Sequence, residues 1–345
     1  MSLLEIKGLE TEFQTEQGVV KALRGINYTV DRGEVLGIVG ESGSGKSVGM
    51  LSLMGLLAPN GTVTAGEMIF DGEDISPIKY KTKKEKKEYE KKMNQIRGND
   101  ISMIFQDPMS YLNPIVTIEK QMTEGIRFHT KCSKKEAVQR AIELMKMVGI
   151  PAPESRLKQY PFEFSGGMRQ RIIIAIALAC NPKLIVADEP TTALDVTVQA
   201  QILDLLKDIT KESNAGVIII THDLGVVASL CDRISIMYGG NIMEEGTTDE
   251  IFYDPKHPYT KGLLNSIANS NADHREPLKP IPGTPPDLLK LGDQCPFASR
   301  CSEAMEICTK ASPLVTEFGE THKCKCWLHC KERWHEVLKG EDAYE

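Results

Sequence analysis

Residues 40–47 read Gly-Glu-Ser-Gly-Ser-Gly-Lys-Ser and follow the apolar run Val35–Val39 directly. This spacing of glycines, lysine and serine is typical of a loop that holds phosphate groups between a strand and a helix. The glycines let backbone N–H groups turn toward phosphates, and the helix adds the positive end of its dipole. We expect Lys46 to reach the β- and γ-phosphates and the Ser47 hydroxyl to bind Mg²⁺. The predicted nucleotide-binding residues are Gly40, Ser42, Gly43, Ser44, Gly45, Lys46 and Ser47.

Two carboxylates end another apolar run, at residues 184–187. Acidic residues at a strand end are often only solvated loop residues, but here they accompany a phosphate loop. Asp188 is placed to hold Mg²⁺, and Glu189 lies one residue further, at the carboxyl edge of the strand. The pattern predicts that Glu189 orients or deprotonates the attacking water.

Short, fully apolar runs alternate with helical segments along the chain, which indicates a largely parallel sheet covered on both faces. These runs are Val35–Val39, Ile101–Phe105, Leu184–Ala187 and Val217–Ile220. The dipeptide Gly239-Gly240 between two further strand-like runs predicts a hairpin that adds antiparallel strands at the sheet edge. The expected fold class is therefore α/β.

Charge and hydropathy narrow the functional classes. The formal charge of −7, from 41 basic and 48 acidic residues, gives no electrostatic reason to expect nucleic acid as a partner. The longest apolar run, 172–180, is far shorter than the roughly 20 residues of a membrane span. No basic and apolar leader is visible at the first residues, so a cytosolic location is expected.

Residues 164–168, Phe-Ser-Gly-Gly-Met, precede an apolar helical run at 172–179, and Ser165 is a natural helix N-cap. The segment resembles the signature motif of ABC ATPases, with Phe and Met replacing the usual Leu and Gln. The residues that would touch phosphate, Ser165, Gly166 and Gly167, are unchanged. The resemblance extends over nearly the whole chain and implies ATP as the nucleotide. It also implies a RecA-like core with an antiparallel β edge and an α-helical subdomain at about 107–180, all within a nucleotide-binding domain at 1–259.

The same resemblance assigns further residues of the ATP site. Gln106 matches the glutamine that meets Mg²⁺ or water, and His222 matches the switch histidine that contacts the γ-phosphate. Phe13 lies where the family places an aromatic side chain on adenine, and a core or surface role is nearly as well supported. Asp195 belongs to the D-loop. In this family Ser165 and Gly167 serve the ATP of a second subunit, so function implies a dimer.

The C-terminal third resembles the ATPase subunits of oligopeptide, dipeptide and nickel importers, notably at 255–260, 280–283 and 295–301. This implies a peripheral subunit at the cytoplasmic face of the bacterial membrane that powers peptide uptake. The implied partners are two permease subunits, a paralogous ATPase in a heterodimer, and a peptide-binding protein reached through the permease. Nickel or another small solute stays open as substrate. A non-transport ABC ATPase acting on nucleic acid or ribosomes is disfavoured by the single cassette and the absence of heptads. His257 is expected to be structural.

Six of the nine cysteines lie between Cys295 and Cys330, which in a reducing compartment favours metal over disulfides. The resemblance maps a 4Fe–4S cluster onto Cys295, Cys301, Cys308 and Cys326. Zinc sites usually pair cysteines two to four residues apart, a spacing absent from these four. Cys324 and Cys330, and less strongly His322 and His329, stay open as the fourth ligand. The cluster segment follows a proline-rich connector within the expected extension 260–345.

We expect the cluster to have a structural or docking role, with no part in hydrolysis, because it lies far in sequence from every phosphate motif. An electron-transfer or redox-sensing role is the rival interpretation. Elsewhere, eight lysines and three glutamates crowd residues 79–92. This segment is predicted to be a solvated helix face, with contact to anionic lipid headgroups as the alternative.

Overall fold

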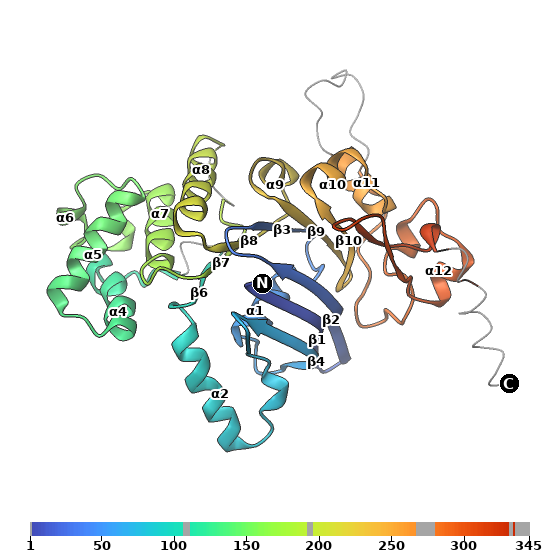
Figure 1. Cartoon of the computed structure of the whole chain (residues 1–345), viewed down its shortest axis with the longest axis horizontal. Helices are drawn as coiled ribbons and strands as arrows, with labels where there is room; N and C mark the ends of the chain where they lie inside the picture. The colour runs from blue at the N-terminus through green and yellow to red at the C-terminus, as the bar shows by residue number, and fades with distance from the viewer. Residues whose placement is uncertain (1, 106–110, 192–195, 267–279, 331–333, 335–345) are drawn as a thin grey trace. The chain divides into compact units, whose positions relative to one another are not determined.

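The computed structural model describes residues 2–105, 111–191, 196–266, 280–330 and 334 (Figure 1). The chain divides into two compact units, each assembled from segments distant in sequence. The first comprises Met1–Leu4, Thr29–Val35 and Phe70–Ile220, and the second comprises Glu5–Tyr28, Leu36–Ile69 and Thr221–Glu345.

The first unit is built on three parallel strands, β6 (Ile101–Ile104), β7 (Leu184–Asp188) and β8 (Gly216–Thr221). Ile101 pairs with Leu184, and Leu184 pairs with Gly216. Every residue of β7 and β8 is buried, as fully apolar strands require when both faces of a sheet are covered. The predicted parallel α/β arrangement is confirmed.

Helices α4, α5 and α7 of the first unit pack against one another (Figure 1). A reciprocal capping box between Ser133 and Glu136 starts α5, and Ser165 caps α7. The predicted extent of the helical subdomain, 107–180, stays a prediction. The further elements of this unit are β5 (Glu73–Asp74), α2 (Lys83–Ile96), α4 (Ile118–Thr130), α5 (Lys134–Met147), α6 (Pro153–Arg156), α7 (Gly166–Ala177), α8 (Val196–Ser213) and two 3-10 turns (Pro77–Lys79, Pro161–Glu163).

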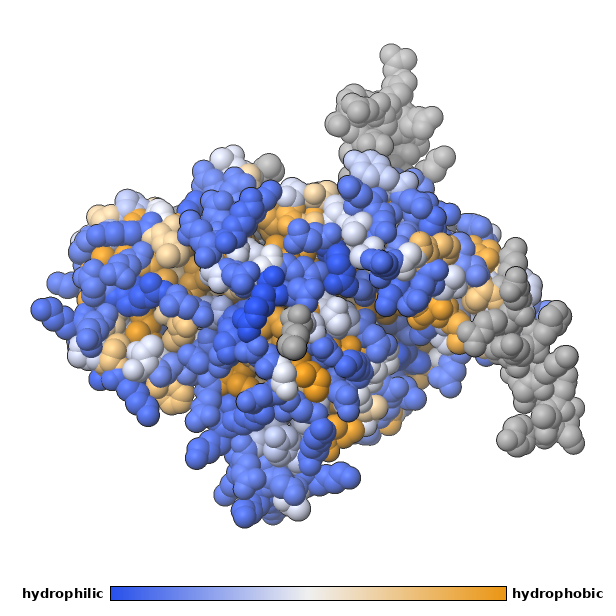
Figure 2. All heavy atoms as spheres, in the orientation of Figure 1, coloured by the Kyte–Doolittle hydropathy of each residue, from blue (hydrophilic) through white to orange (hydrophobic). Residues whose placement is uncertain are grey.

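The lysine-rich segment forms α2, which begins at a capping box between Thr82 and Glu85. Tyr89, Met93 and Ile96 form its buried face, and most of its lysines are exposed. Figure 2 shows a largely hydrophilic surface over this helix. The predicted solvated helix is therefore confirmed, and a lipid contact stays a prediction.

The second unit contains two groups of strands. In one group β1 (Leu4–Thr15) lies between β2 (Gly18–Val30) and β4 (Gly61–Phe70). In the other, β3 (Val35–Val39) pairs in parallel with β9 (Arg233–Tyr238). The phosphate loop leaves the end of β3 and enters α1 (Lys46–Met54), so strand, loop and helix follow in the predicted order.

Gly239 and Gly240, with φ of 53° and 77°, turn the chain from β9 into the antiparallel β10 (Asn241–Thr247). This confirms the predicted hairpin and antiparallel edge. Strand β12 (Lys323–Lys325) then pairs with β10, and β11 (Val315–Glu317) pairs with β12. The C-terminal segment thus continues the sheet of the second unit, and the boundary at residue 259 stays a prediction. The remaining elements are α9 (Leu224–Leu230), α10 (Thr248–Tyr253), α11 (Pro258–Asn265), α12 (Glu306–Lys310) and two 3-10 turns (Ala298–Arg300, Trp327–His329).

The part of the chain that the structure describes contains no helix long and apolar enough to cross a membrane.

Candidate functional site

The phosphate loop is packed so tightly that two positions exclude any side chain. A Cβ on Gly40 would lie 2.2 Å from the carbonyl oxygen of Met237, at the end of β9. Gly45 has a φ of 105°, and its Cβ would lie 2.9 Å from the carbonyl oxygen of Ala22. Only glycine avoids both the clash and the left-handed strain. Strands β2 and β9 therefore fix the backbone of this loop.

Lys46 is buried at the start of α1, and its Nζ donates to the carbonyl oxygens of Gly40 (2.6 Å) and Glu41 (2.9 Å). The buried Ser44 Oγ makes no hydrogen bond to any described residue. Ser42, Gly43 and Ser47 are exposed. A buried hydroxyl without a partner beside a lysine and a helix N-terminus suits a polyanion, because the anion supplies acceptors to these donors. The loop therefore fits the triphosphate of ATP.

Asp188 and Glu189 lie at the carboxyl end of β7, in the first unit. Asp188 is buried, and Glu189 is partly exposed. Glu189 has a φ of 46°, and its N–H donates to the carbonyl oxygen of Ile220 at 2.8 Å. A left-handed backbone at a residue other than glycine costs free energy and is concentrated at functional sites. The Gln170 amide donates to the carbonyl oxygen of Pro190 at 2.7 Å, which anchors the chain just beyond this strained residue.

The signature segment opens helix α7. Ser165 Oγ accepts the N–H of Met168 at 3.4 Å, the N-cap geometry predicted from the sequence. No atom lies within 4 Å of a Cβ placed on Gly166, whereas one on Gly167 would lie 2.9 Å from a methyl group of Val198. The helix end is open at Gly166, as an anion site requires.

The two departures from the usual signature have a structural explanation in Arg156. The Arg156 guanidinium lies 5.7 Å from the ring centroid of the buried Phe164. The same guanidinium donates to the sulfur of Met168 at 3.7 Å. Phe164 and Met168 therefore pack against one cation and leave the Ser-Gly-Gly backbone unaltered.

Of the other predicted ATP-site residues, the structure describes two, His222 and Phe13. His222 follows β8 and is exposed. Phe13 on β1 is half-buried, and its ring would lie 2.7 Å from a Cβ on Gly61, so this glycine makes room for it. Gln106 and Asp195 lie outside the described residues. The second unit thus holds the phosphate loop, Phe13 and His222, and the first holds the carboxylates and the signature segment.

Four C-terminal thiols influence one another. Burial raises the pKa of Cys295 to about 12, and the thiols of Cys308, Cys326 and Cys301 contribute in the same direction. Burial also raises the pKa of Cys301 and of Cys308. The pKa of Cys326 is instead lowered, chiefly by a hydrogen bond from the Cys324 thiol. These thiols therefore affect one another's ionisation, and their binding of a cluster stays a prediction.

One of these sulfurs also accepts a backbone hydrogen bond: the N–H of Met305 donates to Cys308 Sγ at 3.5 Å. Among the described residues, however, no three His, Cys, Asp or Glu side chains converge as they would around a metal ion.

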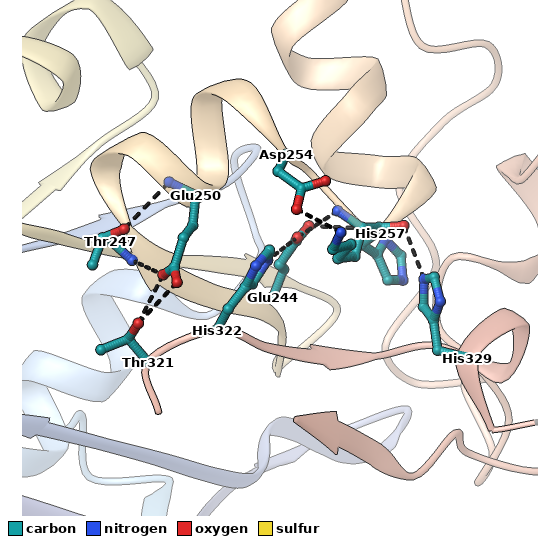
Figure 3. A network of polar contacts seen from close by, with 9 residues as sticks. Glu244, Thr247, Glu250, Asp254, His257, Thr321, His322 and His329 are labelled. Atoms are coloured by element: carbon teal, nitrogen blue, oxygen red, sulfur yellow. Dashed lines mark hydrogen bonds and ion pairs between the residues drawn. The ribbon is translucent and has the colours of Figure 1, made fainter. Parts of the chain in front are cut away.

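A network of polar groups surrounds Glu244, and no pattern in the sequence predicted it (Figure 3). The carboxylate of Glu244, on β10, accepts the backbone N–H groups of Lys256 (2.6 Å) and His257 (2.9 Å). His322 Nε2 lies 2.8 Å from its Oε1, and His329 Nε2 lies 3.2 Å from the carbonyl oxygen of Lys256. Of the two histidines considered as cluster ligands, His322 thus connects the C-terminal segment to β10, and His329 connects it to the chain just before α11. His257 itself caps α11 by accepting the N–H of Tyr259 at 3.0 Å, as a structural residue would.

These motifs, in this order on an α/β core, define an ATP-hydrolysing cassette of the ABC type. The ABC transporter family model matches residues 23–192. The model described as the oligopeptide/dipeptide transporter C-terminal region matches residues 243–308. A solved structure titled as the dimeric structure of MJ0796, a bacterial ABC transporter cassette, is 29% identical with a TM-score of 0.61. The alignment covers 71% of this chain and 98% of that one.

Relatives cover almost the whole chain. The oligopeptide transport ATP-binding protein OppD of Bacillus subtilis is 52% identical over 94% of this chain and 88% of its own length. The dipeptide transport ATP-binding protein DppD of the same organism is 48% identical over 98% of both chains. The chain belongs to the family of oligopeptide/dipeptide transport ATP-binding proteins of ABC transporters.

Proposed function

We propose that this chain is the ATP-hydrolysing subunit of an importer that takes up oligopeptides or dipeptides across the bacterial cytoplasmic membrane. The observation that carries the proposal is the similarity to OppD and DppD along nearly the full length, including the C-terminal region at 243–308. These relatives are named for peptides, which favours peptides over nickel or another small solute. The chain would work at the cytoplasmic face of the membrane.

The proposed partners are two permease subunits and a second, paralogous ATPase, with a peptide-binding protein reached through the permease. Ser165, Gly166 and Gly167 would then bind the ATP held by the partner ATPase. Support comes from the open N-terminus of α7 and from the dimeric cassette among the similar structures.

In the proposed mechanism Lys46 and the phosphate-loop backbone hold the triphosphate. Ser47, Asp188 and Gln106 would hold Mg²⁺, which when bound neutralises charge that develops on the phosphates. Glu189 would orient the attacking water, because its strained backbone fixes where its carboxylate points. His222 would contact the γ-phosphate, Phe13 would stack on adenine, and Asp195 would act at the dimer interface.

Replacing Glu189 by Gln tests this function. The amide keeps the size of the side chain but is a far weaker base, so ATP binding should persist while hydrolysis and peptide uptake are lost. ATP affinity, phosphate release and accumulation of a labelled peptide would be measured in the assembled transporter. A matched control is Glu306→Gln, on an exposed carboxylate of α12. A wild-type rate of hydrolysis by Glu189→Gln would contradict the catalytic assignment. Uptake of nickel but not of peptide by the wild-type transporter would contradict the proposed substrate.

We also propose that Cys295, Cys301, Cys308 and Cys326 bind a 4Fe–4S cluster. The thiols of Cys301, Cys308 and Cys326 raise the pKa of Cys295, and Cys308 Sγ accepts the N–H of Met305 at 3.5 Å, a contact of the kind that tunes iron–sulfur clusters. Cys324 instead donates to Cys326, and the Cys330 thiol donates to the carbonyl oxygen of Cys326 at 3.5 Å. These contacts favour Cys326 as the fourth ligand.

Protein purified without oxygen should therefore be brown and contain near-stoichiometric iron and sulfide. Cys301→Ser should lose both, whereas Cys330→Ser should retain both. One zinc ion per chain and no sulfide would overturn the cluster, and loss of iron from Cys330→Ser would overturn the ligand set.

A further inference from the structure

One side chain of the C-terminal segment, Arg300, reaches the phosphate loop. Arg300 ends the 3-10 turn Ala298–Arg300, and its side chain is 5% exposed. Its Nη1 lies 2.6 Å from Oε2 of Glu41, and its Nη2 lies 3.1 Å from Oε1. Two parallel hydrogen bonds of this kind fix orientation as well as charge. Glu41 is the second residue of the phosphate loop, so the C-terminal segment holds the loop directly.

The guanidinium is fixed independently of Glu41. Its Nε donates to the carbonyl oxygen of Pro282 at 2.8 Å, and Nη2 donates to that of Ile281 at 3.2 Å. Nη1 lies 3.1 Å from the hydroxyl of Tyr238. All three nitrogens therefore have acceptors, and the cation presents a rigid fork to the loop.

Glu41 is held at three points. Its carboxylate contacts Arg300, its N–H donates to the Tyr259 hydroxyl at 3.0 Å, and its carbonyl oxygen accepts from Lys46 Nζ at 2.9 Å. Lys46 is the residue expected to reach the phosphates. A displacement of Glu41 would therefore move an acceptor of the lysine that binds ATP.

A cation beside Glu41 would offset the repulsion between its carboxylate and a bound triphosphate. The phosphate-loop pattern leaves this position free, and a carboxylate there repels the triphosphate. Near a protein surface two like charges at 4 Å repel by roughly 4 kcal/mol, against about 1 kcal/mol in water. Arg300 cancels this charge at contact distance.

We propose that Arg300 is a positioning residue for ATP binding, which holds Glu41 and neutralises it so that the phosphate loop and Lys46 accept the triphosphate. The proposal concerns how ATP is bound, and it does not require that the transported substrate or the group held by the four cysteines be known.

The test measures ATP affinity of the full-length chain by titration calorimetry with a non-hydrolysable ATP analogue and Mg²⁺. Arg300→Gln should raise the Kd about tenfold, equivalent to about 1.4 kcal/mol. In the assembled transporter the KM for ATP should rise by a similar factor, while kcat at saturating ATP stays within about twofold. The matched control is Lys290→Gln, whose side chain is 82% exposed in the same segment and whose loss should leave the Kd unchanged.

A double-mutant cycle separates a direct effect from general loss of structure. In a Glu41→Gln background the Arg300→Gln substitution should change the Kd less than about twofold, because the partner charge is already absent. An equal loss in both backgrounds, or a folded Arg300→Gln chain with wild-type Kd, would overturn the proposal. If Arg300→Gln does not fold, Arg300→Lys decides: it keeps the cation but not the paired hydrogen bonds. It should raise the Kd about threefold, and an unchanged Kd refutes the positioning role.

Discussion

Replacing Glu244 by Ala would leave three donors buried without their acceptor. They are the backbone N–H groups of Lys256 and His257 and the imidazole of His322 (Figure 3). Glu244 is 1% exposed, so water reaches the vacated position poorly. Because Glu244 also faces Cys324 across the β10–β12 pair, the substitution should loosen the C-terminal strands from the sheet.

The size of the effect follows from these contacts. Leaving a buried donor without its acceptor typically costs about 1–3 kcal/mol, so losing an acceptor that three donors share should cost at least about 3 kcal/mol. The Glu244→Gln variant keeps one acceptor oxygen but turns an NH₂ group toward a donor. It should therefore cost less, about 1–3 kcal/mol, the range for one unsatisfied buried group.

Tryptophan fluorescence during urea unfolding would measure both effects, because the two tryptophans of the sequence are Trp327 and Trp334. The buried Trp327 donates to the carbonyl oxygen of Ala311 at 3.0 Å, so its emission reports on the C-terminal segment. Glu306→Gln, which removes an exposed ion pair with Lys310, should cost less than about 0.5 kcal/mol. If Glu244→Ala unfolds with the free energy of this control, the network does not stabilise the segment.

Three further predictions concern pH and loop packing. Burial lowers the pKa of His257 to about 3, so the free energy of unfolding should be unaffected by this group above pH 6.5 and fall by up to about 1.4 kcal/mol per pH unit below it. The His257→Asn variant can still cap α11 and should show a smaller decline in urea titrations between pH 6.5 and 4.5. Burial alone would raise the pKa of Glu250, but hydrogen bonds from Thr247 and Thr321 lower it overall, so this stabilisation is present above pH 4.5 and lost as the pH falls through the lowered pKa. Thr321→Val should therefore cost about 1 kcal/mol at pH 7 and less in acid, and an equal cost at both would contradict the assignment. Gly40→Ala should weaken ATP binding more than about tenfold, equivalent to about 1.4 kcal/mol, because the added Cβ would meet the carbonyl oxygen of Met237. Calorimetry would measure this loss, and the control Gly292→Ala, at a position with open space around it, should show none.

Local patterns predicted most of the core. The bounds of β3 agree with the apolar run Val35–Val39 seen in the sequence, because this strand is buried throughout and needs apolar residues at nearly every position. The Gly239-Gly240 turn was predicted for a similar reason, since positive φ at both positions favours glycine. The three-residue strands β11 and β12 carry no periodicity, and β10, the partner of β12, lies far earlier in the chain. Such pairings depend on tertiary contacts that no short window of sequence contains.

The features of the candidate site likewise include some that local sequence predicted and some that it did not. Motif spacing located the phosphate loop, the carboxylates and the signature segment, because each motif is a local backbone geometry with its own residue requirements. Glu244 was not predicted because a single carboxylate in a strand has no pattern. Its donors lie just before α11 and just before β12, both far from it in the sequence. The left-handed backbone of Glu189 could not be predicted either, since nothing in the sequence distinguishes a strained glutamate from a relaxed one.

The cluster segment was expected to take no part in hydrolysis, because it lies far in sequence from every phosphate motif. That expectation stays a prediction, and Arg300 of the same segment contacts Glu41 across 259 positions of sequence. Cys301, a proposed cluster ligand, is the next residue after Arg300, and the cation is held by the carbonyl oxygens of Ile281 and Pro282 in the proline-rich connector. A change that displaces Cys301 would therefore displace the guanidinium, and through it the phosphate loop. The proposed role of Arg300 therefore predicts that the folding of the cysteine segment and the affinity for ATP rise and fall together.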